Sequence, residues 1–144
     1  MQKGVEPEIM ALFGKKGPDF SYKGKYLGGH SAYPKDMDVN LMLNPDYLEI
    51  PEFPAMIPYD KITNVQSMSQ DKLTKTRLLL TGVFAFAWKK KQMFMVLTYE
   101  DDIGIVQNPV FSVNKINEVQ PTIYQRMMNA RMMQKRAQQQ QNGN

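Results

Sequence analysis

The sequence predicts a mainly β domain that is closed by one C-terminal helix. Three observations lead to this fold class: short runs of β-branched and aromatic residues recur between residues 20 and 113, turn residues separate these runs, and helical spacing of apolar residues begins at residue 116. Short connections favour antiparallel pairing. We therefore expect a curled antiparallel sheet or barrel of about seven strands, with the amphipathic helix over its open end.

The first strands are predicted between residues 20 and 50. Residues 20–29 end in a Gly-Gly pair that suits a β-bulge, and residues 39–43 are joined to residues 47–50 by the turn sequence Asn-Pro-Asp. The next stretch, residues 51–58, contains three prolines, which cannot donate a hydrogen bond to a neighbouring strand. That stretch is predicted to be an edge strand or a connector.

A long hairpin is expected in the second half of the sheet. Residues 61–68 predict a strand, and residues 70–75 predict a polar loop that leads into the hairpin. The two arms of the hairpin are residues 78–88 and residues 93–99, both rich in apolar and aromatic side chains. The loop between them begins with three lysines and forms the tip.

The last strand and the helix follow. Residues 104–113 predict a strand that Pro109 places at an edge or a bulge. Asn117 and Gln120 have the form of a capping box, which would place Pro121 in the first turn of a helix. Apolar residues then recur at steps of three and four, on one face of that helix: Ile116, Val119, Ile123, Met127 and Ala130.

The chain divides into three predicted segments. Residues 1–19 form an N-terminal extension with a short amphipathic helix at residues 9–13, residues 20–134 form the domain, and residues 135–144 form a Gln-rich tail that is expected to be disordered. The N-terminus lacks the apolar run of a secretory signal, and no run approaches the roughly 20 apolar residues that a membrane-spanning helix needs. The expected location is cytoplasmic, with the inner face of the membrane kept open as a site of contact.

Composition excludes several kinds of chemistry. The 144 residues include no cysteine, so disulfides, thiolate-bound metals and a thiol nucleophile are excluded. His30 is the single histidine and is interpreted as a loop residue with local hydrogen bonds, and Glu100, Asp101 and Asp102 are interpreted as a solvated turn. No motif of a hydrolase, a nucleotide-binding site or a metal site is present. We expect no enzyme, cofactor or metal; a deep pocket that gathers His30 with carboxylates would favour an enzyme instead.

The basic hairpin tip is one candidate binding site. Lys89, Lys90 and Lys91 lie beside Trp88, whose ring is typical of membrane interfaces, so these four residues are the predicted contact with anionic lipid. Each lysine would contribute about 1 kcal/mol near an acidic membrane surface, so the tip alone would bind more weakly than a millimolar affinity. A simple solvated turn is the alternative interpretation.

The C-terminal helix is the second candidate. The net charge of +4 comes from residues 115–144, because residues 1–114 hold 13 basic and 13 acidic side chains. The helix carries basic residues and methionines off its apolar stripe, and five of these are the predicted surface for a protein partner or self-association: Arg126, Met128, Arg131, Met132 and Met133. The alternative is nucleic-acid binding by the basic residues Arg126, Arg131, Lys135 and Arg136. The neutral net charge of residues 1–114 argues against this alternative, because binding along phosphates needs basic side chains over a wide surface.

Residues 20–134 resemble the pleckstrin-homology-like superfold, in particular its GRAM-like and prokaryotic members. The resemblance lies in the segment IPYDKI (Ile57–Ile62), the long hairpin with its KKK tip, the strand PVFSV and the terminal helix. It implies a curled antiparallel sheet capped by a helix, and an adaptor that binds proteins or membrane lipid. The phosphoinositide-binding members carry a basic loop between their first two strands. The matching loop here offers His30 and Lys35 without an arginine, which argues against specific phosphoinositide recognition.

Overall fold

The computed structural model describes residues 18–75 and 93–142. In chain order these residues form β1 (Phe20–Gly28), β2 (Met37–Leu43), β3 (Tyr47–Ile50), β4 (Ala55–Pro58), the 3-10 turn η2 (Tyr59–Lys61), β5 (Ile62–Ser69), α2 (Gln70–Thr74), β6 (Met93–Glu100), β7 (Val106–Gln107), β8 (Val110–Val113) and α4 (Ile116–Asn142). The mainly β prediction with one long C-terminal helix is confirmed.

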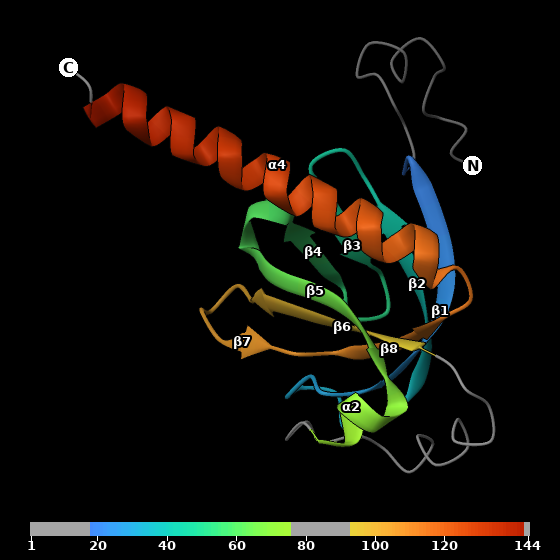
Figure 1. Ribbon diagram of the computed structural model, residues 1–144. Coiled ribbons are helices and arrows are strands. Elements are labelled where there is room, and N and C mark those ends of the chain that lie inside the picture. Colours follow the sequence, from blue (N-terminus) through green and yellow to red (C-terminus); the bar gives the residue numbers. More distant parts are fainter. Residues whose placement is uncertain (1–17, 76–92, 143–144) are drawn as a thin grey trace, which may run out of the picture.

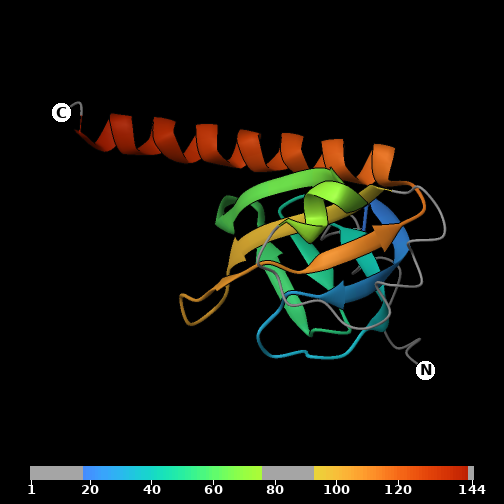
Figure 2. The same cartoon turned by 60° about the horizontal axis from the view of Figure 1, so that its bottom comes forward.

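The strands form one antiparallel sheet that curls into a half-barrel. Its order is β4-β3-β2-β1-β8-β6-β5, and the short strand β7 pairs with β6 beside this path. The two ends of the path, β4 and β5, are consecutive in the chain and are separated only by η2. Because this connection is so short, the sheet has to curl until its two edges approach each other. Figures 1 and 2 show the curled sheet with α4 lying across one of its open ends.

The predicted features of the first hairpins are confirmed. The pairing of β1 with β8 shifts register between Tyr26 and Gly28, so the Gly-Gly pair does mark a bulge. Gly29 has a φ of +98°, and a Cβ on this residue would collide with the carbonyl oxygen of Asn108. Glycine is therefore required where the chain enters the loop that carries His30. The proline-rich stretch supplies β4, which is an edge strand as expected.

Strand β6 is buried on both of its faces. Met95, Leu97 and Tyr99 belong to the main core between the sheet and α4, whereas Phe94 and Val96 belong to a second apolar cluster on the opposite face. This double burial explains the nearly continuous apolar sequence of the strand.

The pairing of β6 differs from the predicted hairpin. One edge of β6 pairs with β5 from Met93 to Tyr99, and the other pairs with β7 and β8. The predicted hairpin partner, residues 78–88, lies outside the described residues, but both edges of β6 are already occupied by other strands. Sequence reasoning missed this because a strand that is buried on both faces has the same composition wherever its partners lie in the chain.

The predicted polar loop at residues 70–75 is instead largely a short helix, α2. The side chain of Ser69 accepts a hydrogen bond from the backbone N–H of Lys72 and so caps the first turn. Leu73 is 1% exposed and covers the second apolar cluster, together with Leu27 and the outward face of β6. One buried leucine in a polar segment was too weak a pattern to predict this helix.

Helix α4 confirms the predicted apolar stripe but not the predicted cap. Ile116, Val119, Ile123 and Met127 are buried, and Ala130 packs against the same core. The helix begins at Ile116, so a capping box at Asn117 and Gln120 is wrong, and Pro121 lies beyond the first turn. The helix also continues to Asn142, through the segment that the sequence analysis predicted to be disordered.

Side chains of α4 also cover the free edge of β5. The Gln120 amide donates to the carbonyl oxygen of Val65 at 3.0 Å, and Arg131 donates to the carbonyl oxygen of Ile62 at 2.9 Å. These two bonds satisfy backbone acceptors on an edge strand that would otherwise be available for pairing with another chain. None of the helices in the described ranges is both long and apolar enough to cross a membrane.

Candidate functional site

The predicted lipid-contact residues lie outside the described residues. These are Trp88, Lys89, Lys90 and Lys91, and the short N-terminal helix expected at residues 9–13 is likewise outside. Membrane contact through the lysine tip therefore stays a prediction.

Arg126 was predicted to contact a partner, but it is used inside the domain. Its guanidinium group donates to the carbonyl oxygen of Asn44 at 2.7 Å and to the Asp19 carboxylate at 3.1 Å. The same group lies 5.6 Å from the ring centre of Phe20 and 5.8 Å from that of Tyr59. Together these contacts connect the middle of α4 to the start of β1 and to the turn after β2.

Arg131 is also an anchor, since its guanidinium group reaches the carbonyl oxygen of Ile62. With Arg126 and Arg131 both engaged, two of the four basic side chains proposed for nucleic acid are bound to the domain itself. Lys135 and Arg136 are exposed. Two basic side chains can neutralise only two phosphates, so they would contribute only a small part of the affinity that a nucleic-acid-binding protein needs.

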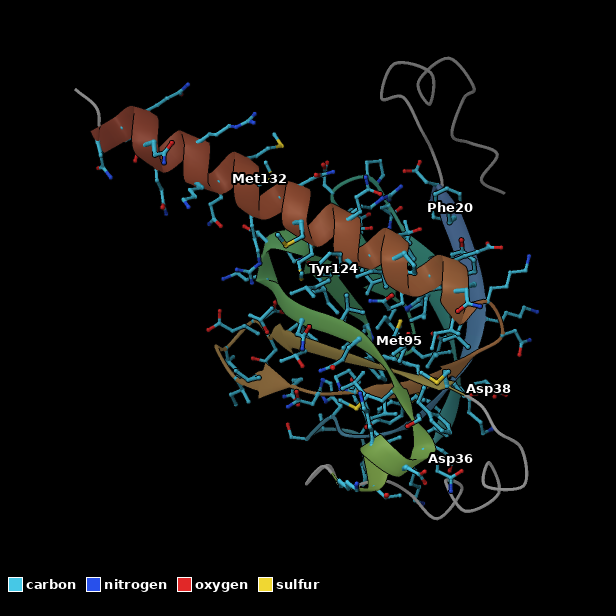
Figure 3. The ribbon with its side chains drawn as sticks, in the orientation of Figure 1. Phe20, Asp36, Asp38, Met95, Tyr124 and Met132 are labelled. Atoms are coloured by element: carbon cyan, nitrogen blue, oxygen red, sulfur yellow. The ribbon has the colours of Figure 1, made fainter. Side chains whose placement is uncertain are left out.

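The predicted methionines of α4 lie on a surface that the domain does not cover. Met128 is 39% exposed, Met132 50% and Met133 69%, and Tyr124, one turn before Met128, is 46% exposed. Tyr124, Met128 and Met132 recur at steps of four, so they follow one side of the helix, which we call the α4 apolar face. Figure 3 shows Tyr124 and Met132 on this helix, with Met132 on the part that extends beyond the strands.

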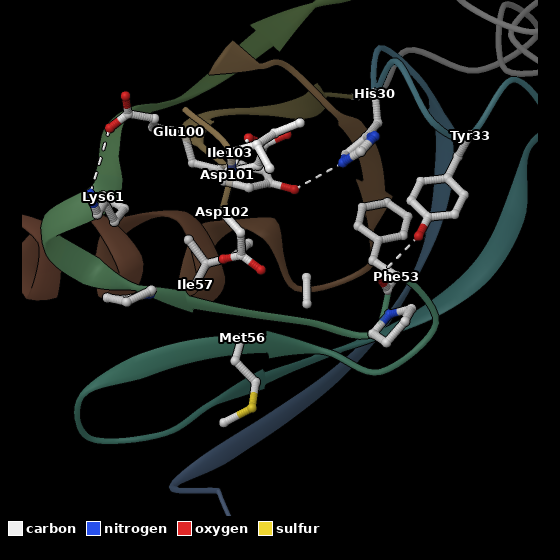
Figure 4. A pocket seen from close by; sticks show the side chains of 14 residues that line it. His30, Tyr33, Phe53, Met56, Ile57, Lys61, Glu100, Asp101, Asp102 and Ile103 are labelled. Atoms are coloured by element: carbon white, nitrogen blue, oxygen red, sulfur yellow. Dashed lines mark hydrogen bonds and ion pairs between the residues drawn. The ribbon is translucent and has the colours of Figure 1, made fainter. Parts of the chain in front are cut away.

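A second candidate site is a cavity of about 410 Å³ at the side of the half-barrel where β4 faces the turn between β6 and β7. We call it the β4–β6 pocket. One wall is Phe53 and the residues of β4, and the opposite wall is the end of β6 with the turn that follows it, while His30 and Tyr33 close one end (Figure 4). This pocket could not be predicted from local sequence patterns, because its walls come from three segments that are far apart in the chain.

His30 is held in one orientation by hydrogen bonds at both ring nitrogens. The backbone N–H of Ala32 donates to Nδ1 at 3.0 Å, so Nδ1 carries a lone pair and the proton of the neutral ring lies on Nε2. Nε2 is 3.0 Å from the Tyr99 hydroxyl, to which it donates. Burial lowers the pKa of His30, and the nearby negative charge of Asp101 opposes this shift. His30 does lie in a loop and does accept a local hydrogen bond from Ala32, but its bond to Tyr99 joins the loop to a strand that is distant in the sequence, which the sequence interpretation did not include.

Asp101 organises the turn after β6. Its Oδ1 accepts hydrogen bonds from the backbone N–H groups of Ile103 and Ile105, and its Oδ2 accepts one from the buried amide of Gln107. The bond from Gln107, followed by that from Ile105, lowers the pKa of this carboxyl group, so it stays ionised. Gln107 also pairs with Ser31 through two hydrogen bonds, which ties this turn to the His30 loop.

Aromatic side chains line the inner end of the pocket. The rings of Tyr33 and Phe53 are stacked, with centroids 4.7 Å apart, and the His30 ring lies 4.8 Å from Tyr33 and 5.2 Å from Phe53. The Tyr33 hydroxyl donates to the Phe53 carbonyl oxygen, and Tyr99 is only 3% exposed. Burial raises the pKa of Tyr99, so its hydroxyl group keeps its proton.

The pocket does gather His30 with carboxylates, the arrangement that would favour an enzyme. Its groups are nevertheless tied into structural hydrogen bonds: both ring nitrogens of His30 are used, and Asp101 has a lowered pKa where a general base needs a raised one. No hydroxyl group of a serine or threonine among the described residues is paired with His30 as a nucleophile would be. Residues 18–75 and 93–142 also contain no cluster of three or more metal-ligating side chains. In this geometry His30 and Asp101 act as hydrogen-bond partners within the fold.

Comparison of the chain with protein-family models, with curated proteins and with solved structures found no match. The architecture alone therefore defines the class: a mainly β protein with a curled antiparallel half-barrel and one C-terminal helix. Fold by itself does not determine function, and the features of this molecule that bear on function are the α4 apolar face and the β4–β6 pocket.

Proposed function

We propose that this protein is a non-enzymatic, pleckstrin-homology-like binding module that docks a protein partner on the α4 apolar face. The observation that carries the proposal is that Tyr124, Met128 and Met132 form an exposed row on a helix that extends beyond its own domain. Methionine side chains are flexible and polarizable, and they are common on surfaces that receive a partner. The half-barrel with its terminal helix is compatible with the pleckstrin-homology-like fold.

The charge of α4 indicates the chemistry of the partner. After Glu118 the helix contains no acidic residue, whereas Lys135 and Arg136 are exposed on the same half as Met132. Two copies of this helix would repel each other, and an acidic surface with an apolar groove would be complementary to it. We therefore commit to an acidic partner protein; self-association of the chain is the competing outcome.

Site-specific crosslinking tests this proposal. A photoreactive phenylalanine analogue at position 132, incorporated in the full chain in cells, should crosslink to one acidic protein, which mass spectrometry identifies. The matched control places the same analogue at position 71, on the exposed surface of α2, and should not capture that protein. The double substitution Met128→Gln and Met132→Gln, tested with the analogue at position 133, should remove the crosslink.

Two results would contradict the proposal. Equal capture of the same protein from positions 132 and 71 would mean that the α4 apolar face is not a specific surface. A crosslink to a second copy of the chain, together with concentration-dependent dimerisation in sedimentation velocity, would replace the acidic partner with self-association.

Membrane association through Trp88, Lys89, Lys90 and Lys91 stays a separate prediction. Co-sedimentation with vesicles of rising anionic lipid content, at low and at physiological salt, measures it directly. Binding that increases with anionic lipid and is lost when the three lysines are changed to glutamate would support it. If the protein stays in the supernatant at both salt concentrations, the lysine tip is a solvated turn.

A further inference from the structure

The β4–β6 pocket carries an inference that is independent of the α4 apolar face. Its charged lining residues are Lys61, Glu100, Asp101 and Asp102, so three carboxylates oppose one ammonium group around a cavity whose histidine is neutral. Lys61 pairs with Glu100 at 3.7 Å at the outer rim, where both side chains are about half exposed. The remaining excess of negative charge belongs to Asp101 and Asp102.

The aromatic wall of the pocket favours the same kind of ligand. The π-electron face of an aromatic ring attracts a cation, and this attraction is stronger where water is excluded. His30, Tyr33 and Phe53 form a compact aromatic cluster, and the carboxylates of the β6–β7 turn lie across the pocket from it (Figure 4). A cationic group between these two walls would meet a ring on one side and a carboxylate on the other.

Exposed apolar side chains flank the mouth. Met56 of β4 is 59% exposed and Ile103 of the turn is 78% exposed, although both line the pocket. Two exposed apolar side chains on opposite walls can cover the methylene groups of a long basic side chain whose charged end has entered the pocket. This pairing of an apolar mouth with an acidic interior fits arginine or lysine better than it fits a small inorganic cation.

The Tyr99 hydroxyl group indicates a further property of the ligand, a hydrogen-bond acceptor. Its hydroxyl oxygen accepts the proton of His30 Nε2, and its own O–H has no acceptor among the described residues, although the side chain is 3% exposed and lines the pocket. A buried donor without an acceptor is costly, and a ligand carbonyl oxygen would satisfy it. The ligand should therefore combine a cationic group with a nearby acceptor, as an amino-acid residue in a peptide does.

The neighbouring edge strand limits the binding mode. β4 is only four residues long and ends in Pro58, while Pro54 precedes it, so this edge offers few backbone N–H groups for a ladder with an added strand. Recognition would therefore come from the pocket and not from main-chain pairing. Arginine suits the pocket better than lysine, since its planar guanidinium can stack on a ring and bind a carboxylate through two hydrogen bonds.

We propose that the β4–β6 pocket binds an arginine side chain of a partner polypeptide, with the guanidinium group between the aromatic cluster and the carboxylates of Asp101 and Asp102. The residue's main-chain carbonyl accepts the hydrogen bond of the Tyr99 hydroxyl.

Titration by NMR tests the proposal with small probes. The full-length, isotope-labelled protein is titrated with N-acetyl-arginine methylamide, with the lysine analogue, and with the citrulline analogue, which has nearly the same shape as arginine without its charge. We expect amide shift changes at residues 30–33, 53–58 and 99–103, with the arginine probe about tenfold tighter than citrulline and severalfold tighter than lysine. Equal affinity for arginine and citrulline, or no shifts at these residues, would overturn the proposal.

Two variants locate the interaction. Asp102→Asn should weaken arginine binding about fivefold, while the matched control Asp71→Asn, on α2, should leave it unchanged. Tyr99→Phe should weaken binding of the arginine probe and leave binding of free spermidine, a cation without a carbonyl group, unaffected. If spermidine binds as tightly as the arginine probe and Tyr99→Phe alters neither, the pocket is a site for free polyamines and the peptide proposal is wrong.

Discussion

The two halves of α4 lie in different surroundings. From Ile116 to Ala130 the helix buries an apolar stripe against the sheet, and Gln120 and Arg126 add hydrogen bonds to backbone carbonyl groups. From Met132 to Asn142 every residue is exposed. The difference shows that the first half is required for the fold, whereas the second half contributes little to it and is available for another purpose.

The largest expected difference between the two halves is in stability. Ile123 is 0% exposed in the main core, so Ile123→Ala removes buried methyl groups and leaves a cavity. We expect the free energy of unfolding to fall by about 3 kcal/mol. Met132→Ala, the control on the projecting half, should change it by less than about 0.5 kcal/mol. Urea denaturation measures both, and equal losses would show that the two halves are not distinct.

The anchoring role of Arg126 predicts the next largest effect. Arg126→Ala removes the hydrogen bond to the Asn44 carbonyl and the ion pair with Asp19. The side chains of this ion pair are largely buried: Arg126 is 22% exposed and Asp19 is 18% exposed. We expect a loss of about 1–2 kcal/mol in the same urea measurement. Arg136→Ala is the matched control on the exposed half and should have almost no effect. A neutral result for Arg126→Ala would mean that Arg126 is free to serve a partner.

The features of the fold that could be predicted from the sequence are those that depend on neighbouring residues. Local patterns were sufficient for the turn after β2, the Gly-Gly bulge, the proline-rich edge strand and the apolar stripe of α4, because each depends on residues close together in the chain. The partners of β6 and the β4–β6 pocket could not be predicted, because they depend on contacts between distant segments. The exposure of Met128 and Met132 was expected, whereas the internal bonds of Arg126 and Arg131 were not, since a basic side chain on a helix has the same spacing whether it faces water or a carbonyl group.

The titration of His30 predicts a smaller, pH-dependent effect. His30 is the single histidine, and its pKa in the folded protein lies below the usual value of 6.5. Below pH 6.5 the unfolded chain therefore binds a proton more readily than the folded one, so stability should fall as the pH falls from about 6.5 to 5. The neighbouring ionisable groups do not change charge in this range, because Tyr99 keeps its proton and Asp101 stays ionised.

His30→Asn separates this effect from general acid sensitivity. Its amide oxygen can still accept the hydrogen bond from the Ala32 N–H, but the side chain does not titrate. Urea denaturation of both proteins between pH 5 and pH 8 should give a flatter profile for the variant in the lower part of the range. Parallel profiles would show that protonation of His30 is not coupled to folding.

Removal of residues 132–144 should have the smallest effect on folding and a large effect on binding. The described residues that are removed, 132–142, are all exposed, so the free energy of unfolding should change by less than about 0.5 kcal/mol. Crosslinking from position 128 to the acidic partner should be lost, because Met132, Lys135 and Arg136 are gone. Arginine binding in the β4–β6 pocket should be unchanged, since its lining residues come from the sheet and its connecting segments. A truncated protein that loses both partner crosslinking and arginine binding would show that the α4 apolar face and the β4–β6 pocket act as one site. The division of α4 into a structural half and a binding half would then be wrong.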